Sequence, residues 1–355
     1  KAGHALTFKM DHSSGADQQH EFSRMSLAVI DISPLWNGGD TQSVARQIGE
    51  ACRSIGFFYA TGHGVDERLI ECVYRQAAAF HALPQVEKER YHIAFSRNHR
   101  GYVPPGEEDY GSEPGTGLKE SFDLAADLPA DDPDYLRGYR FLGPNVWPDL
   151  PGFKSAVGTY YEAMMALGRN LLRGFALALD LAPDYFNDRI EKPTSNLRLL
   201  HYPAIPTSDL GIGSHTDSEC FTMLHQTKPG LQVMTVKDLW TDVPPVAGAF
   251  VVNVGDTLET WTNGRFRSGQ HRVISIREER FSLPLFFAAD FDSWIEPLPH
   301  FISDSHPPAY VGFRSGEHIL SEYAKGFRYL RALHREGRIT LVTEPDEASK
   351  FARMV

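Results

Sequence analysis

Apolar residues recur at helical spacing in three stretches of the first half of the chain. They predict helices over residues 44–55, 69–80 and about 151–179. The segments 28–32, which opens with the apolar run 28–30, and 57–60 predict strands, and Gly56 is expected to end the first helix just before the second strand. Residues 98–150 are rich in glycine, proline and acidic side chains, and we expect them to form long loops.

After residue 195 the pattern changes to short apolar runs separated by turn signals such as Lys228-Pro229-Gly230 and Asn263-Gly264. These runs predict strands at 197–202, 221–224, 231–234, 249–254, 271–276 and 281–283. Evenly spaced strands without intervening helices favour an antiparallel sandwich or barrel over a doubly wound sheet. The charged segment 316–340 is helix-like and is expected to pack on the outside.

These changes of pattern predict how the chain is organised. Residues 1–24 are polar and without period, and we interpret them as an added leader or a native disordered tail. A region of helices and strands is then expected over 25–190, a core of strands over 191–300, and a helical region over 301–355.

Composition narrows the class of protein. With 355 residues, 42% of them hydrophobic, the chain is able to bury a real core. Its 35 basic and 46 acidic residues give a net charge of −11, so we expect neither a nucleic-acid nor a membrane partner. The three cysteines, Cys52, Cys72 and Cys220, are too few for a disulfide framework, and this favours a reducing cytoplasm.

One short motif has the spacing of a metal site. His215 and Asp217 are two residues apart, so on an extended chain both side chains point to the same face. A third candidate, His271, opens a predicted strand 56 residues later. Two histidines and one carboxylate suit Fe(II) and leave positions on the ion open for reactants, whereas a structural zinc site needs a fourth protein ligand.

Other histidines compete for this role. His334 and Glu336 have the same spacing, but they lie in the helix-like tail, where residues two apart point away from each other. We interpret His201 and His225 as hydrogen-bonded core histidines, because a single histidine on a strand is more often that than a ligand.

A second pattern indicates a site for a carboxylate. Arg280 and Ser282 share a strand face, where a planar guanidinium and a hydroxyl could bind one carboxylate together. Tyr202 could add a phenolic donor. The alternative is that Arg280 belongs to the charged surface run at 277–280.

Taken in order, these motifs resemble the isopenicillin N synthase-like family of 2-oxoglutarate/Fe(II)-dependent dioxygenases. The matching segments are 29–31, 56–58, 62–64, 101–102, 119–120, 197–203, 215–217, 230–233, 253–256, 261–264, 271–273 and 280–282. The resemblance implies a mixed α and β fold, with a distorted double-stranded β-helix (jelly-roll) core and flanking helices. It also implies iron on His215, Asp217 and His271.

The resemblance further implies the reaction and the co-substrate site. The 2-oxoglutarate would meet Arg280 and Ser282 through its C5 carboxylate, with Tyr202 helping. With Fe(II) and O2, the enzyme would oxidise a C–H bond of a small-molecule substrate and release succinate and CO2. The alternatives within the fold are an isopenicillin N synthase-type Fe(II) oxidase that does not use 2-oxoglutarate, and an ethylene-forming 2-oxoglutarate oxygenase. Outside it stand a redox-silent binding protein and a zinc hydrolase.

Substrate contacts are expected from two places. The loops at 98–123 offer Tyr102, Lys119 and Phe122, and the last predicted strand offers Phe286. We interpret the neighbouring Phe287 as a core residue. The oligomeric state is not indicated by the pattern.

Overall fold

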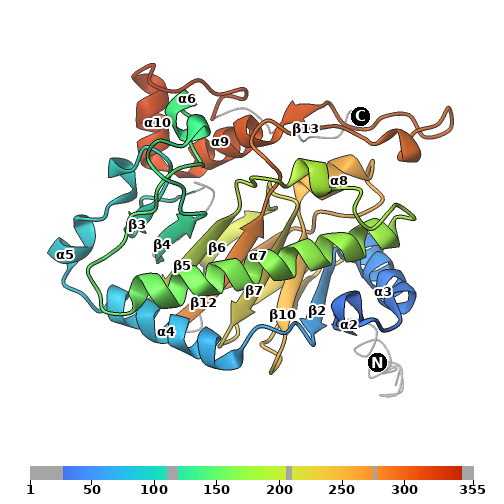
Figure 1. Cartoon of the computed structure of the whole chain (residues 1–355), viewed down its shortest axis with the longest axis horizontal. Helices are drawn as coiled ribbons and strands as arrows, with labels where there is room; N and C mark the ends of the chain where they lie inside the picture. The colour runs from blue at the N-terminus through green and yellow to red at the C-terminus, as the bar shows by residue number, and fades with distance from the viewer. Residues whose placement is uncertain (1–26, 110–118, 205–209, 275–277, 346–355) are drawn as a thin grey trace, which may run out of the picture.

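The computed structural model describes residues 27–109, 119–204, 210–274 and 278–345 (Figure 1). The interpretation of residues 1–24 therefore falls outside the described part of the chain, as does the end of the strand predicted at 271–276.

Within the described residues, the larger sheet has eight strands in the order β1-β2-β10-β7-β12-β5-β4-β3. Every neighbouring pair in it is antiparallel except β1 with β2. The bounds are β1 (Ala28–Asp31), β2 (Phe57–Thr61), β3 (Gly101–Val103), β4 (Glu120–Ala125), β5 (Asn196–Tyr202), β7 (Phe221–Gln226), β10 (Phe250–Val254) and β12 (Arg280–Phe287).

A second, four-stranded antiparallel sheet has the order β6-β11-β8-β9, and two further strands, β13 and β14, form a ribbon. The bounds are β6 (Leu210–His215), β8 (Leu231–Met234), β9 (Trp240–Asp242), β11 (His271–Ile274), β13 (Trp294–Ile295) and β14 (Phe313–Arg314). The predicted class, mixed α and β with an antiparallel strand core, is confirmed at this level.

Helices cover one face of the larger sheet, and the longest of them, α7, lies across it (Figure 1). The helices are α2 (Pro34–Asn37), α3 (Thr41–Ser54), α4 (Glu67–His81), α5 (Gln85–Glu89), α6 (Pro133–Arg137), α7 (Phe153–Ala178), α8 (Asp256–Trp261), α9 (Ser315–Gly326) and α10 (Arg328–Arg335). Asp40 and Asp66 cap α3 and α4 by accepting hydrogen bonds from backbone N–H groups of the first turn. The three helices predicted in the first half are therefore confirmed.

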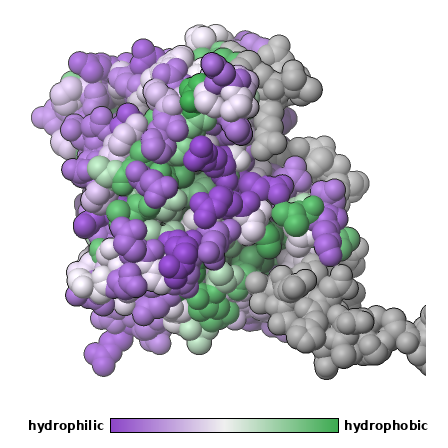
Figure 2. Space-filling model, turned by 90° about the vertical axis from the view of Figure 1, so that its right-hand side faces the viewer, coloured by the Kyte–Doolittle hydropathy of each residue, from purple (hydrophilic) through white to green (hydrophobic). Residues whose placement is uncertain are grey.

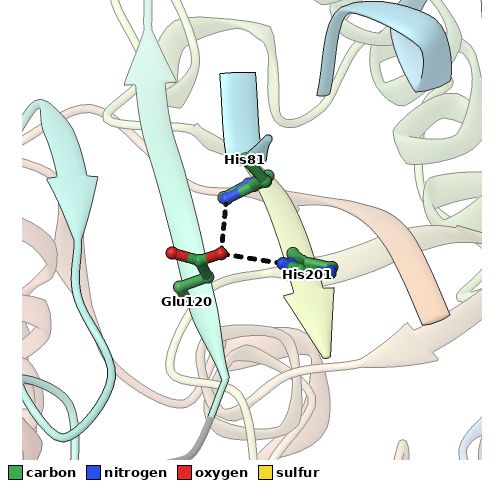
Figure 3. A group of neighbouring side chains, drawn as sticks. All are labelled: His81, Glu120 and His201. Atoms are coloured by element: carbon green, nitrogen blue, oxygen red, sulfur yellow. Dashed lines mark hydrogen bonds and ion pairs between the residues drawn. The ribbon is translucent and has the colours of Figure 1, made fainter. Parts of the chain in front are cut away.

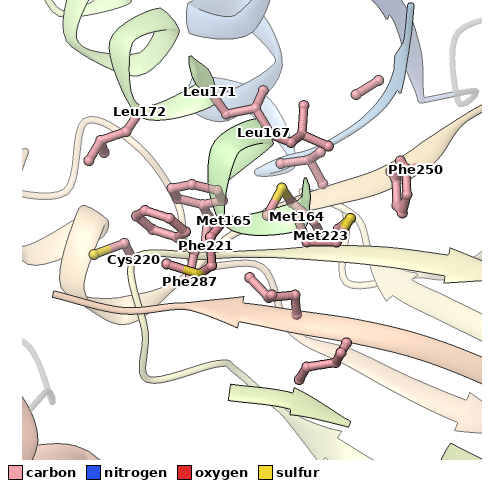
Figure 4. Packing of buried hydrophobic residues seen from close by; sticks show 14 of the residues in the cluster. Met164, Met165, Leu167, Leu171, Leu172, Cys220, Phe221, Met223, Phe250 and Phe287 are labelled. Atoms are coloured by element: carbon pink, nitrogen blue, oxygen red, sulfur yellow. The ribbon is translucent and has the colours of Figure 1, made fainter. Parts of the chain in front are cut away.

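The main core lies between α7 and the sheet (Figure 4). Phe175 of α7 packs on Phe221 of β7, whose ring stacks on Phe287 of β12 at 4.8 Å between centroids. Gly168 allows this close approach, because a Cβ there would lie 2.3 Å from the Phe287 ring. Phe287 is thus a core residue, as its pattern indicated.

Two expectations about local structure are wrong in part. The segment 98–150 contains β3, β4 and α6 rather than loops alone. β4 was not predicted because it contains the charged residues Glu120 and Asp123, which a pattern of apolar residues does not count as buried. In the structure both are buried against partner side chains. The tail does form helices α9 and α10, but α9 is not simply an outer element, since it buries Ile319, Leu320 and Ala324.

The surface seen in Figure 2 is largely hydrophilic, with hydrophobic residues gathered in its middle. Such a mixture is ordinary for a folded protein. Across the described part of the chain, the structure contains no helix long and apolar enough to cross a membrane.

Candidate metal centre and active-site pocket

Strand pairing brings the predicted metal ligands together. His215 is the last residue of β6 and His271 the first of β11, and the antiparallel register places them directly opposite each other. Asp217 follows β6 by two residues. One ligand atom from each of the three lies within 4.8 Å of the other two.

The atoms facing each other are those a metal needs. The Nε2 atoms of His215 and His271 lie 3.7 and 3.6 Å from Oδ1 of Asp217. Each Nδ1 instead meets a backbone carbonyl, that of Gly213 at 2.8 Å and that of Gly269 at 3.1 Å. Because a carbonyl only accepts, both Nδ1 atoms carry the proton and both Nε2 atoms present a lone pair.

The carboxylate is oriented in the same way. Oδ2 of Asp217 accepts hydrogen bonds from the Thr222 hydroxyl at 2.5 Å and from the Asn253 amide at 2.8 Å. These two donors hold the side chain so that Oδ1 faces the two imidazoles. The sequence analysis gave no role to Thr222 on β7 or to Asn253 on β10, although Asn253 opens one of the matching segments.

Electrostatics favour the protonation states that bind a cation. Burial, and next the neighbouring His271, lower the pKa of His215 to about 4, so its imidazole is neutral at neutral pH. Burial acts to raise the pKa of Asp217, but His271, His215 and the two hydrogen bonds hold it below its ordinary value. A neutral imidazole beside a charged carboxylate is what metal coordination requires.

The predicted carboxylate site is also assembled. Arg280 and Ser282 of β12 are buried, and the Arg280 Nη1 lies 3.4 Å from the Ser282 hydroxyl. Tyr202 is paired with Arg280 across β5 and β12, and its ring lies 4.7 Å from the guanidinium. Gln226 holds Nη2 at 2.9 Å. Arg280 is therefore an interior residue, and its alternative reading as a surface charge is wrong.

A pocket opens beside the metal group. Its lining is Glu108, Arg198, Leu200, Ile212, His215, Thr216, Asp217, Ser218, Glu219, Phe286, Glu322 and Tyr323. Of the predicted substrate residues, Phe286 lies in this lining and Lys119 contacts it through an ion pair with Glu108. Tyr102 and Phe122 do not line it; both are buried, in the main core.

Sequence patterns missed several of the lining residues. Arg198 donates to both oxygens of Glu108, at 3.0 and 2.7 Å, and to Asp123 at 3.1 Å. A charge inside the apolar run 197–200 was the available signal, since a buried arginine needs a partner. Tyr323 donates to Glu219 at 2.8 Å, and burial, followed by the charge of Asp217, raises the pKa of Glu219 to about 7.

The remaining histidines lie elsewhere. His225 accepts from or donates to the Tyr74 hydroxyl at 2.8 Å, and His201 lies between two glutamates. His334 sits on α10 with Nε2 2.9 Å from Glu344. Among the described residues, none of these three shares a group of possible ligands with His215.

Removing the charge of Glu108 is expected to destabilise the fold. Glu108 is buried and forms ion pairs with the buried Arg198 and Lys119. The Glu108→Gln substitution removes the negative charge from both pairs. Breaking a buried pair in this way costs about 3–5 kcal/mol. Urea unfolding followed by circular dichroism should show a loss of that order at neutral pH. Glu87→Gln, which breaks an exposed pair with Arg90, should leave stability nearly unchanged.

The two ion pairs of Glu108 predict that the stability of the fold depends on pH. Burial acts to raise the pKa of Glu108, but Arg198 and Lys119 outweigh it and hold that pKa below its ordinary value. The stabilisation is therefore present above the unfolded-state pKa of a glutamate and is lost as the pH falls through the folded-state value. The difference between Glu108→Gln and the parent should shrink on acidification, and a constant difference would contradict this account.

Comparison with protein families finds two matches. Residues 27–150 match the family described as the non-haem dioxygenase in morphine synthesis N-terminal, and residues 193–289 match the 2OG-Fe(II) oxygenase superfamily. The second match includes all three residues of the metal group and the Arg280 site.

Individual proteins are similar over most of the chain. Kihadalactone A synthase of Citrus sinensis is 36% identical, over 84% of this chain and 91% of its own. A 2-oxoglutarate-Fe(II) type oxidoreductase of Emericella nidulans is 33% identical, over 92% and 98%. Among solved structures, Neurospora crassa T7H in complex with α-KG and thymine has a TM-score of 0.73 and 27% identity, over 84% of this chain and 96% of its own. A 2OG-Fe(II) oxygenase family protein from Caulobacter crescentus has a TM-score of 0.74 and 28% identity, over 88% and 99%.

Proposed function

Because this chain belongs to the 2OG-Fe(II) oxygenase superfamily, we propose that its iron is held by His215, Asp217 and His271. The fold is the family's double-stranded β-helix, and the enzyme uses Fe(II), 2-oxoglutarate and O2. It oxidises a C–H bond of a small-molecule substrate and releases succinate and CO2. The observation that carries the assignment of ligands is the convergence of two Nε2 lone pairs and one carboxylate oxygen.

The three side chains fit Fe(II) in donor type and in number. Two imidazole nitrogens and one carboxylate oxygen on one side of an ion leave its opposite side for co-substrate and O2. When bound, the iron supplies the activation of O2 that the reaction requires. The protein contributes position: the carbonyls of Gly213 and Gly269 orient the imidazoles, and Thr222 orients the carboxylate.

The far end of 2-oxoglutarate is assigned to Arg280 and Ser282. The buried guanidinium is held by Gln226 and by the backbone carbonyl of Lys228, so it is oriented before the co-substrate binds. Tyr202 packs against it. A buried charged fork suits a carboxylate, and this supports the assignment.

The pocket supports a small substrate with hydrogen-bonding groups. Arg198, Glu108 and Tyr323 make one part of its lining polar and charged, while Phe286 and Leu200 offer apolar contact. Thymine, bound in the similar Neurospora crassa T7H, is a molecule with both features. We assign Phe286 as the residue that contacts the substrate ring or chain, and Lys119 as the residue that holds Glu108 in place.

Two broader assignments remain proposals. The core of 191–300 acts as the catalytic region, flanked by 25–190 and 301–355. The cysteines Cys52, Cys72 and Cys220 are all free, which supports a reducing, cytoplasmic location.

The alternatives are not favoured. Relatives are named 2-oxoglutarate-dependent dioxygenases, and solved neighbours hold α-KG, so an oxidase that omits 2-oxoglutarate is not supported. None of the relatives and neighbours reported above is named for ethylene formation, so the ethylene-forming alternative gains no support either. The same names oppose a zinc hydrolase and a redox-silent binding protein.

Anaerobic addition of Fe(II) and then 2-oxoglutarate tests this function. The weak visible charge-transfer band of the iron–keto acid chelate should appear, and admission of O2 should produce succinate. A zinc-loaded sample serves as the control, because zinc has no redox chemistry. Iron binding without a band or succinate would contradict the proposed use of 2-oxoglutarate.

A further inference from the structure

A second group of possible metal ligands lies on other elements of the fold. His81 ends α4, Glu120 begins β4 and His201 lies on β5, and Figure 3 shows their side chains pointing toward one another. All three are buried, and one ligand atom of each lies within 4.8 Å of the others. The β4–β5 register pairs Glu120 directly with His201.

His81 presents a lone pair to this group. Its Nε2 lies 3.1 Å from the backbone carbonyl of Leu199, which only accepts, so Nε2 carries the proton. Burial lowers the pKa of His81, and the ring is therefore neutral. Its Nδ1 then has a lone pair, lies 3.3 Å from Oε1 of Glu120, and has no hydrogen-bond partner although it is buried.

His201 has the same orientation. Its Nε2 lies 2.9 Å from the Glu279 carboxylate, and its Nδ1 lies 2.8 Å from the same Oε1 of Glu120. A neutral imidazole has one N–H, so a proton on Nε2 leaves the Nδ1 lone pair directed at Glu120. Only an imidazolium could donate to both carboxylates.

Glu120 is anchored by its other oxygen. Oε2 accepts from Lys88 at 2.7 Å and from the Tyr102 hydroxyl at 2.5 Å. The side chain is thus held with Oε1 facing the two Nδ1 atoms. This arrangement repeats the one at Asp217, where one carboxylate oxygen takes hydrogen bonds and the other faces two imidazoles.

We propose that Nδ1 of His81, Oε1 of Glu120 and Nδ1 of His201 form a second metal site, for a divalent cation of the zinc type. Histidine ligands of metals characteristically donate their other N–H to a carbonyl or a carboxylate, as both do here. Zinc takes nitrogen and oxygen ligands at about 2.0–2.1 Å, which places neighbouring ligands of a tetrahedron about 3.3 Å apart. The distance from His81 Nδ1 to Glu120 Oε1 already has that value. The distance from His201 Nδ1 to the same oxygen, now 2.8 Å, would have to increase by about half an ångström.

The charges around the site limit what it can hold. Lys88 is positive, whereas Glu120 and Glu279 are negative, so a dication held by two neutral imidazoles leaves a small positive balance. The lysine stays on Oε2 and does not compete for Oε1. A water molecule completes the fourth position. The cation would tie α4, β4 and β5 together one residue before Tyr202, whose ring packs on Arg280.

Zinc binding measured by equilibrium dialysis and elemental analysis tests the site. The His215→Ala variant is used as the background, so that the first metal group no longer binds. One equivalent of zinc should remain, and adding His81→Ala should remove it. Co2+ should give the visible bands of a tetrahedral site, which a cation scattered over surface histidines does not give.

Glu279→Gln is the second, milder variant. Glu279 is exposed, so the change is not expected to unfold the protein. The glutamine can still accept from His201 Nε2, but loss of the carboxylate charge should weaken zinc binding by about 10- to 100-fold. The neighbouring Glu278→Gln, which breaks only an exposed pair with Lys228, should leave affinity unchanged. Absence of bound zinc in the His215→Ala background, or zinc binding that is insensitive to Glu279→Gln, would overturn the proposal and leave His201 as a histidine hydrogen-bonded between two carboxylates.

Discussion

The Asp217→Ala enzyme is expected to lose its iron and its turnover together. Oδ1 of Asp217 is an anionic atom that faces both Nε2 atoms, at 3.7 and 3.6 Å. Without it, two neutral imidazoles must hold a dication alone. Loss of a residue that merely orients a ligand already costs about 10- to 100-fold in metal affinity, so loss of the ligand itself should cost more than that.

Iron content after desalting, measured with succinate production, checks this expectation. Asp217 is buried and also accepts from Thr222 and Asn253, so His215→Ala, at a partly exposed position, provides a second variant that spares those bonds. His334→Ala is the matched control. His334 lies on α10 and is two residues before Glu336, the same spacing as between His215 and Asp217. Full iron content in either variant of the metal group would rule that residue out as a ligand.

The Arg280→Leu enzyme is expected to need far more 2-oxoglutarate. Arg280 is buried, and loss of its guanidinium would leave the carboxylate of the co-substrate in a buried site without a counter-charge. Truncating one side of such a pair costs about 2–5 kcal/mol. At about 1.4 kcal/mol per factor of ten, the apparent KM for 2-oxoglutarate should rise by roughly 30-fold to several thousand-fold.

Steady-state succinate assays over a range of 2-oxoglutarate concentrations measure this change. Arg280→Lys should give an intermediate KM, because it keeps the charge but loses the planar fork. Arg75→Leu removes an exposed cation that is paired with Glu71 on α4 and should leave the KM unchanged. An Arg280→Leu enzyme with the parent KM would exclude Arg280 from the co-substrate site. Such a result would not count against the proposal that Asp217 binds iron.

The sequence by itself determined the helices and most strands, and it named the three residues that the structure brings together as the proposed metal group. Amphipathic periodicity reports which face of an element is buried, and this information is local, as in α7. The spacing of His215 and Asp217 predicts a shared face on an extended chain, and the two side chains do lie close together, although only His215 belongs to β6. His271, Arg280 and Ser282 were placed with them by the ordered resemblance to a family.

Only the tertiary structure decided which distant polar residues meet. Glu108 and Arg198 are 90 residues apart, and α9 brings Tyr323 to Glu219 across 104 residues. Likewise, the description of His201 as a hydrogen-bonded core histidine was incomplete, because its partners Glu120 and Glu279 come from two other segments. Burial of such groups depends on partners that no local pattern encodes, since a buried charge is tolerated only where the folded chain supplies its counterpart.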